Sequence, residues 1–197
     1  MKIIGLTGGI GMGKSTASAT FRRHRVPIFD ADRAVHELQA VGGRAVRPIE
    51  AAFPGTTRDG AVDREALRRA VLGNPEALKV LERLVHPLVR DAEKRFLAAA
   101  RRAGNSIVVL DIPLLLETGG EKRVDKVVVV SAPAAVQAAR VMRRPGMTRE
   151  RLAAIRARQM PDGEKRRCAD VVIHSGLSRH FAVAAIKRLM HRLRGAA

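Results

Sequence analysis

A glycine-rich octapeptide near the start of the chain, Gly8–Ser15, constrains the fold more than any other segment. It reads Gly-Gly-Ile-Gly-Met-Gly-Lys-Ser and matches G-x-x-x-x-G-K-[ST] at every fixed position. It follows the apolar run 3–6 and precedes an alanine-rich stretch that favours a helix. Glycines let backbone N–H groups turn inward around phosphate oxygens, and a helix N-terminus adds positive dipole. A strand, this loop and a helix together predict a nucleoside triphosphate site.

The residue types of this phosphate loop also suggest individual roles. The Lys14 ammonium can reach the β- and γ-phosphates, and the Ser15 hydroxyl can ligate Mg²⁺. A glycine-rich turn that holds nothing is the alternative, and the strand before it and the helix after it argue against that reading. The residues expected to contact the nucleotide are Gly9, Ile10, Gly11, Met12, Gly13, Lys14, Ser15 and Thr16.

Five short apolar segments predict the sheet that carries this loop. They are rich in β-branched residues, nearly continuous in hydrophobicity and separated by helical patterns, as is typical of a parallel sheet covered on both faces. We therefore predict an α/β protein, a P-loop NTPase three-layer fold with a five-stranded parallel sheet in a single domain, 1–197. The predicted strands are 2–7, 26–29, 106–112, 124–130 and 171–173.

Two segments are too long to be simple connections between these strands. Residues 33–105 have helical character, with a clear helix start at 74–76, and are expected to form a helical substrate-binding insertion. Within it, His86 before Pro87 is expected to begin another helix. Residues 140–168 hold nine arginines between positions 140 and 167, with turns expected at 145–146 and 161–163. A solvated basic face is the alternative, but next to a phosphate site we favour an arginine-rich lid.

The charge balance needs an explanation, since 37 basic and 19 acidic residues give a net charge of +18. The basic residues are spread along the whole chain, and the absence of Trp and Tyr leaves no aromatic platform for single-stranded nucleic acid. We therefore interpret the basicity as a field that attracts anions such as ATP and phosphorylated substrates, with no obligate nucleic-acid partner.

The cysteine count and the apolar runs bear on location. A single cysteine, Cys168, cannot form an internal disulfide, which fits a reducing cytoplasm. The sequence contains no run of 18 consecutive apolar residues, so we expect no membrane span. The apolar run near the N-terminus is too short for the core of a signal peptide. We expect a cytoplasmic protein without a membrane partner. The sequence does not fix an oligomeric state, and a monomer is the working expectation.

Carboxylates follow two of the predicted strands at their carboxyl ends, where ligands bind in open α/β sheets. Asp32 comes just after the second strand, and Asp111 lies near the end of the third, where a Mg²⁺-binding acid is expected. Asp30 is expected to cap the next helix. His86 is a lone histidine, and a structural role is the stronger reading for such a residue.

Taken in order, several motifs resemble the dephospho-CoA kinase family over essentially the whole chain. The phosphate loop alone would fit many kinases, but the form Thr-Gly-Gly-Ile-Gly followed by Asp-x-Asp is far more specific. The matching segments are Leu6–Thr16, Asp30–Asp32, His86–Pro87, Pro113–Glu117, Gln137 with Arg140 and Arg144, Gln159, and Ala169–Asp170. The resemblance implies an enzyme that transfers the γ-phosphoryl group of ATP to the 3′-hydroxyl of dephospho-CoA, the last step of coenzyme A synthesis.

The resemblance also implies roles for individual residues. Asp32 would orient the acceptor hydroxyl as a catalytic residue together with Lys14 and Arg140. Arg144 would be a second lid cation on the nucleotide. His86 and Leu115 would belong to the dephospho-CoA site.

Two positions depart from the family pattern. Met12 stands where the family often has Ser or Thr, and only the backbone is required there. Asp111 stands at a variable position, so its part in binding Mg²⁺ is left open.

Three other functions remain to be weighed. Another small nucleoside or nucleotide kinase would share the loop, lid and fold, and a panel of acceptors would distinguish it. A nucleotide-dependent protein that binds RNA or DNA would show binding that falls steeply with salt. A GTPase switch is disfavoured because the chain has no clear Asn-Lys-x-Asp segment.

Overall fold

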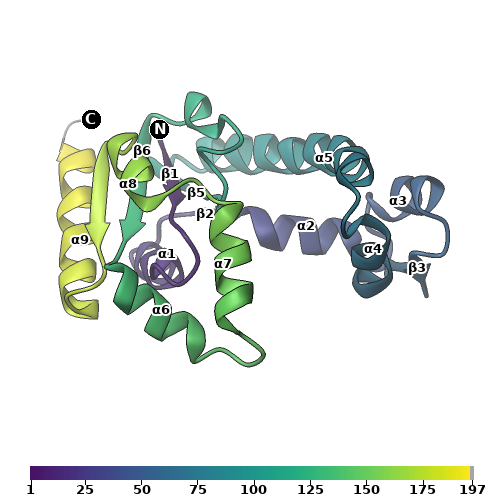
Figure 1. Ribbon diagram of the computed structural model, residues 1–197. Helices are drawn as coiled ribbons and strands as arrows, with labels where there is room; N and C mark the ends of the chain where they lie inside the picture. The colour runs from purple at the N-terminus through teal and green to yellow at the C-terminus, as the bar shows by residue number, and fades with distance from the viewer. Residues whose placement is uncertain (196–197) are drawn as a thin grey trace. The chain divides into compact units, whose positions relative to one another are not determined.

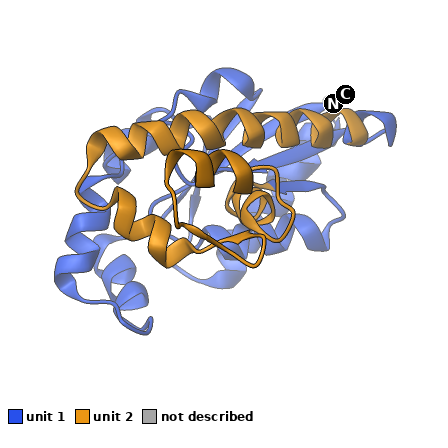
Figure 2. Cartoon of the chain, turned by 90° about the vertical axis from the view of Figure 1, so that its right-hand side faces the viewer, with its two compact units in different colours: residues 1–29, 100–197 blue, residues 30–99 orange. Residues whose placement is uncertain are grey.

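The structure is a computed structural model that describes residues 1–195. The chain divides into two compact units, which Figure 2 shows in different colours. The first unit combines Met1–Phe29 with the chain from Ala100 onward, and the second is Asp30–Ala99. The helical insertion expected at 33–105 therefore corresponds to a unit that begins three residues earlier and ends six residues earlier.

The first unit is built on a five-stranded sheet with the order β2-β5-β1-β6-β7. The pairs β1–β5, β1–β6 and β6–β7 are parallel, and β1 lies at the centre of the sheet. All five predicted strands are present within two residues of the expected limits, and the predicted parallel fold is confirmed. The strands are β1 (Lys2–Thr7), β2 (Ile28–Asp30), β5 (Ile107–Asp111), β6 (Lys126–Ser131) and β7 (Val171–His174).

Helices cover the sheet and connect its strands (Figure 1). Local sequence signals mark several helix starts; for example, the Thr148 hydroxyl accepts a hydrogen bond from the N–H of Arg151 at 3.2 Å. The helices of this unit are α1 (Lys14–Arg23), the 3₁₀ turn η1 (Gly120–Arg123), α6 (Ala134–Met142), α7 (Arg149–Ala157), α8 (Asp162–Arg167) and α9 (Arg179–Gly195).

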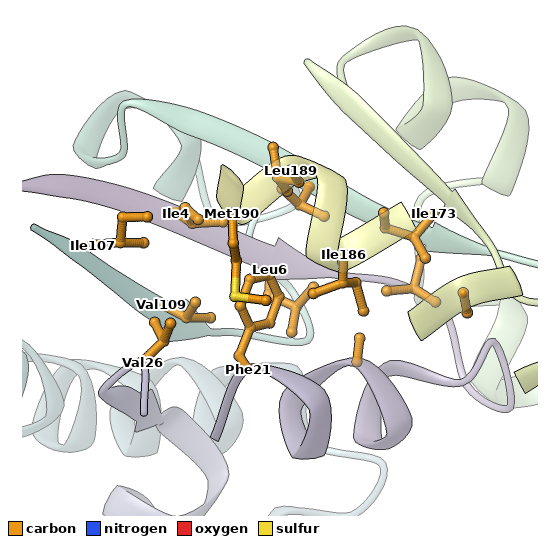
Figure 3. Close-up of a cluster of buried hydrophobic side chains, with 14 residues drawn as sticks. Ile4, Leu6, Phe21, Val26, Ile107, Val109, Ile173, Ile186, Leu189 and Met190 are labelled. Atoms are coloured by element: carbon orange, nitrogen blue, oxygen red, sulfur yellow. The ribbon is translucent and has the colours of Figure 1, made fainter. Parts of the chain in front are cut away.

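The middle residues of the central strands are apolar because both faces of the sheet are covered. All five residues of β5 are buried. One face packs against α1 and α9, where Phe21, Ile186 and Met190 meet Leu6 (Figure 3). The other face packs against the segment after β5, where Leu115 and Leu116 meet Val127 and Val129. This three-layer packing fixes β1, and so fixes the point at which the phosphate loop begins.

The second unit has its own core, formed around Leu38, Ile49, Leu67 and Val85. Acidic and amide side chains cap its helices as the sequence indicates, since Asp30 accepts from the N–H of Arg33 and Asn74 from that of Ala77, both at 3.0 Å. Its elements are α2 (Ala31–Gln39), α3 (Val46–Ala52), the hairpin strands β3 (Thr57–Arg58) and β4 (Ala61–Val62), α4 (Arg64–Val71) and α5 (Pro75–Arg102).

Two expectations about local structure are wrong. His86 and Pro87 do not begin a helix but lie inside α5, where both are exposed. A proline inside a helix costs about 3 kcal/mol, and here the helix continues because Val85 and Leu88 on either side pack into the core of this unit. In the second case, Asp162 and Gly163 are not a turn but the first residues of α8.

No helix within residues 1–195 is both long enough and apolar enough to span a bilayer.

Asp170 ties the start of β7 to the start of β6. Its carboxylate accepts hydrogen bonds from the Lys126 ammonium and from the N–H of Val127, each at 2.8 Å. The Lys126 bond, followed by that from Val127, lowers the pKa of Asp170 below its ordinary value of 3.8. A carboxylate with a lowered pKa stabilises the fold above its unfolded-state pKa, and this stabilisation is lost as the pH falls through the folded-state pKa.

We expect Asp170→Asn to reduce the free energy of unfolding by about 0.5–1 kcal/mol at neutral pH, a small value because solvent screens this carboxylate. The difference from the wild type should shrink as the pH falls below 3.8 and through the lowered pKa of the folded-state carboxylate. Urea unfolding at neutral and acidic pH measures this, with the exposed Glu164→Gln as control. A difference that does not change with pH would contradict the assignment.

Candidate active site

The phosphate loop leaves the central strand at Thr7 and enters α1 at Lys14. Its start is fixed by the Thr7 hydroxyl, which donates to the carbonyl of Pro113 at 2.8 Å. Inside the loop, the N–H of Met12 donates to the carbonyl of Gly9 at 3.1 Å. The loop therefore lies at the carboxyl edge of the sheet, where parallel α/β folds bind ligands, and ends at a helix N-terminus.

Two glycines of the loop have backbone conformations that other residues rarely adopt. Gly11 has φ of 73° and Gly13 has φ of 93°. A Cβ atom on Gly11 would also lie 2.5 Å from the side chain of Val141 on α6, which is closer than atoms can approach. At this variable position of the motif, glycine is therefore required both by the backbone conformation and by the packing against α6.

Lys14 and Asp111 form an ion pair at the mouth of the loop. The strand register places Asp111 beside Leu6, so the last residue of β5 reaches the first turn of α1. Asp111 is 4% exposed, and its second carboxylate oxygen accepts from the Ser18 hydroxyl at 2.5 Å. The structure thus brings two sequence-predicted site residues into direct contact and adds Ser18, which the sequence analysis did not identify.

Arg140 and Ser175 support the loop from the side of α6 and β7. The Arg140 guanidinium donates to the Ser175 hydroxyl at 2.9 Å and to its carbonyl at 2.7 Å. Ser175 in turn donates to the carbonyl of Met12 at 2.5 Å. Arg140 therefore contacts the phosphate loop directly, at the carbonyl of Gly11 at 3.5 Å, and also through Ser175, a second residue that sequence reasoning missed.

A buried ion pair fixes the segment that follows α7. Lys165 is 1% exposed, and its ammonium lies 2.7 Å from the carboxylate of Glu117. The same carboxylate oxygen accepts from the N–H of Met160 at 2.9 Å. A buried charge needs a partner, so this pair fixes the base of α8 against the segment that follows β5.

A hollow of about 490 Å³ opens beside the loop at the carboxyl ends of β6 and β7. Met12, Ser131 and His174 contribute to its lining, together with Asp162 and Arg166 of α8. The Ser131 hydroxyl donates to Asp162 at 2.8 Å across this region. The first unit thus offers space next to the phosphate loop at the sheet edge that binds ligands.

The other sequence-predicted residues lie in varied environments. Ser15 is exposed on the first turn of α1, and Arg144 is exposed just after α6. Leu115 is completely buried in the core, whereas its neighbour Leu114 is 40% exposed and is the leucine of this motif that a ligand can touch. The remaining two, Asp32 on α2 and His86 on α5, lie in the second unit, where both are exposed.

The fold and the loop define a class of protein. A central parallel strand, a glycine loop of this motif and a lysine at the start of the next helix are the features of a P-loop kinase. The family model described as dephospho-CoA kinase matches residues 2–179, and the chain belongs to this family.

Known proteins agree with this assignment. The chain is 66% identical over 166 residues to the dephospho-CoA kinase of Paramagnetospirillum magneticum, covering 84% of this chain and 78% of that protein. It is 56% identical over 195 residues to the dephospho-CoA kinase of Mesorhizobium japonicum, covering 99% and 98% of the two chains. A crystal structure from Thermus thermophilus is similar with a TM-score of 0.85 and 37% identity, covering 98% and 97%.

We expect Gly11→Ala to destabilise the protein by about 2 kcal/mol or more and to abolish ATP binding, because it adds steric overlap to a strained backbone. Gly104→Ala is the matched control, since Gly104 has nearly the same φ of 71° but nothing within 4 Å of the position that a Cβ atom would take. Urea unfolding and nucleotide titration measure both variants. Equal losses of stability in the two variants would contradict the packing argument.

Proposed function

We propose that this protein transfers the γ-phosphoryl group of ATP to the 3′-hydroxyl of the ribose in dephospho-CoA, giving coenzyme A. The single observation that carries the proposal is the phosphate loop with Lys14 at the start of α1, in a chain that belongs to the dephospho-CoA kinase family. Phosphoryl transfer asks a protein mainly to position two substrates and to neutralise charge. The residue roles that we propose meet these two requirements.

The triphosphate would be held by the loop from Gly9 to Thr16, through the main-chain N–H groups that are not already donated within the protein, as those of Ile10 and Met12 are. Gly11 and Gly13 give the loop the backbone conformation that lets these groups converge. The Lys14 ammonium, which pairs with Asp111 in this structure, would contact the β- and γ-phosphates and stabilise charge that develops during transfer. The N-terminal end of α1 adds its dipole to the same site.

Mg²⁺ fits the oxygen donors beside the loop. It prefers oxygen ligands, keeps several of its waters and takes only one or two protein groups together with substrate phosphates. We propose the Ser15 hydroxyl as its direct protein ligand, with Asp111 acting through water, since the carboxylate of Asp111 already contacts Lys14 and Ser18. When bound, the ion would neutralise charge on the phosphates.

Asp32 is the proposed residue that orients the acceptor hydroxyl. It lies in the first turn of α2, two residues after Asp30, the last residue of β2. A carboxylate is a weak base for a sugar hydroxyl, so it would align the nucleophile and accept the proton late, once bond formation is under way. We assign the second unit, including His86, to dephospho-CoA, with the motif around Leu115 as a further contact.

The arginines of the segment 140–168 would neutralise the transferred group and exclude water as a lid. Arg140 is the first of these, and Arg144 follows four residues later, just beyond α6. Arg140 is already engaged with Ser175 next to the loop, so it would act from a fixed position.

We further propose that the protein acts as a monomer in the cytoplasm. The support for the location is its single cysteine, which excludes an internal disulfide and suits a reducing compartment.

An assay with ATP, Mg²⁺ and dephospho-CoA tests the proposed reaction, with detection of both ADP and coenzyme A. We expect the two products in equal amounts, and phosphate on the 3′-oxygen of the product. Faster phosphorylation of a nucleoside monophosphate than of dephospho-CoA would contradict the proposal and favour another nucleotide kinase. ATP turnover that depends on added RNA or DNA would contradict it as well.

We expect Asp32→Asn to lower kcat by several orders of magnitude while the affinity for ATP stays nearly intact, because an amide cannot accept the proton of the acceptor hydroxyl. Steady-state kinetics and ATP titration measure the two effects separately. Asp59→Asn, a change of the same kind in the hairpin of the second unit, serves as control. Turnover of the Asp32 variant at the wild-type rate would refute the role.

For Arg140→Ala we expect a loss of about 10²–10³ in rate if the guanidinium neutralises charge in the transition state. Arg140→Lys should recover part of this loss because the charge remains. Arg143→Ala, at an exposed neighbouring position, is the matched control. A change of less than about threefold in Arg140→Ala would leave Arg140 with a structural role only.

A further inference from the structure

The two main-chain polar groups of Ile10, inside the phosphate loop, are each bound by a glutamine side chain. The Ile10 N–H donates to Oε1 of Gln159 at 3.1 Å, and the Ile10 carbonyl accepts from Nε2 of Gln137 at 2.8 Å. Gln137 lies on α6 and is 5% exposed, and Gln159 follows α7. The chain therefore contacts the loop at Gln137, runs through α7 and contacts the same loop residue again at Gln159; Figure 1 shows α6 and α7 in green.

The orientation of both side-chain amides is fixed by the chemistry of their partners. Arg156 on α7 donates to Oε1 of Gln137, and a guanidinium can only donate, so Nε2 is the atom that faces the Ile10 carbonyl. The Ile10 N–H can likewise only donate, so Gln159 must present its oxygen. Gln137 is therefore needed as a donor and Gln159 as an acceptor.

These bonds set the direction of two neighbouring peptide planes. In a trans peptide the carbonyl and the N–H point to opposite sides. When Gln159 binds the Ile10 N–H, the carbonyl of Gly9 points the other way, where it accepts from the N–H of Met12 at 3.1 Å. When Gln137 binds the Ile10 carbonyl, the N–H of Gly11 is directed away from Gln137.

The glutamines also lie close to the backbone they bind. A Cβ atom on Gly9 would lie 3.3 Å from Oε1 of Gln159 and 3.4 Å from Nε2 of Gln137. The two amides thus enclose this part of the loop, and Arg156 links the amide of Gln137 to α7. An ordered loop loses less entropy when it binds a ligand, so such contacts favour binding.

We infer that Gln137 and Gln159 are positioning residues that orient the peptide groups of the phosphate loop for the triphosphate and couple the loop to α7. Each acts through the backbone of Ile10. The inference rests on the proposal that this loop binds the phosphates of ATP. The predicted lid segment is thereby coupled to the phosphate loop, so that a change in the position of one changes the other.

The test replaces each glutamine by methionine, which has similar length but no hydrogen-bonding amide. In the nucleotide-free protein, we expect exchange of the Ile10 amide hydrogen to become about tenfold faster in Gln159→Met, as follows from the loss of one hydrogen bond. In both variants, we expect the KM for ATP to rise by about tenfold. The KM for dephospho-CoA should stay nearly unchanged, a split that a general loss of stability would not produce.

Glutamate substitutions make the prediction asymmetric. Gln159→Glu keeps an oxygen acceptor, so the Ile10 amide should retain its wild-type exchange rate. Gln137→Glu replaces a donor by an acceptor that faces the Ile10 carbonyl, so its KM for ATP should be at least as high as that of Gln137→Met. Exchange in Gln159→Glu as fast as in Gln159→Met would overturn the inference.

Gln39→Met, the same change at the end of α2, is the matched control and should leave the Ile10 amide and the KM for ATP unchanged. Unfolding midpoints show which variants fold. If the variants of the buried Gln137 do not fold, the inference is tested by the two Gln159 variants alone. Folded methionine variants with wild-type Ile10 exchange and wild-type KM for ATP would overturn the inference. A wild-type protein that fails to bind ATP would instead refute the proposed function, so the two failures are distinguishable.

Discussion

The phosphate loop can present its N–H groups to an anion only if its own carbonyl groups have partners elsewhere. Glycine-rich backbone is flexible, and ordering it costs free energy that the rest of the fold must offset. Here Ser175 binds the carbonyl of Met12, Gln137 binds that of Ile10, and Met12 itself binds that of Gly9. Partners that are distant in sequence thus fix a loop that local interactions alone would leave mobile.

An ion pair lies beside the same loop. The Lys14 ammonium is compensated by Asp111, which is itself held by Ser18. A triphosphate that enters the loop would meet a lysine whose position is already set, which reduces the entropic cost of contact. The net charge of +18 adds a long-range attraction for anionic substrates, and this attraction weakens as salt is added.

Much of the fold could be predicted from the sequence because its signals are local. Continuous apolar runs give the buried parallel strands, and Asn74 before Pro75 gives the start of α5. The hairpin of β3 and β4 was missed because strands of two residues have no periodicity to detect. Pro87 was misread because a proline near a helix start and one tolerated inside a helix look alike until the packing around them is known.

The candidate site could be predicted only in part, because only some of its residues are marked by local sequence signals. The loop, Lys14 and Asp111 were found by motif and by position at strand ends. Ser18 and Ser175 were not, because each acts through a contact to a residue far away in the sequence. Leu115 was selected from a motif, but its side chain lies in the core, a distinction that depends on the three-dimensional packing.

One measurement tests the central claim most directly: a crystal structure with dephospho-CoA and a non-hydrolysable ATP analogue bound together. The account predicts phosphates bound by the N–H groups of the loop and by Lys14, with the carboxylate of Asp32 hydrogen-bonded to the 3′-hydroxyl in line with the γ-phosphate. Phosphates bound elsewhere, or a 3′-hydroxyl without contact to Asp32, would contradict it.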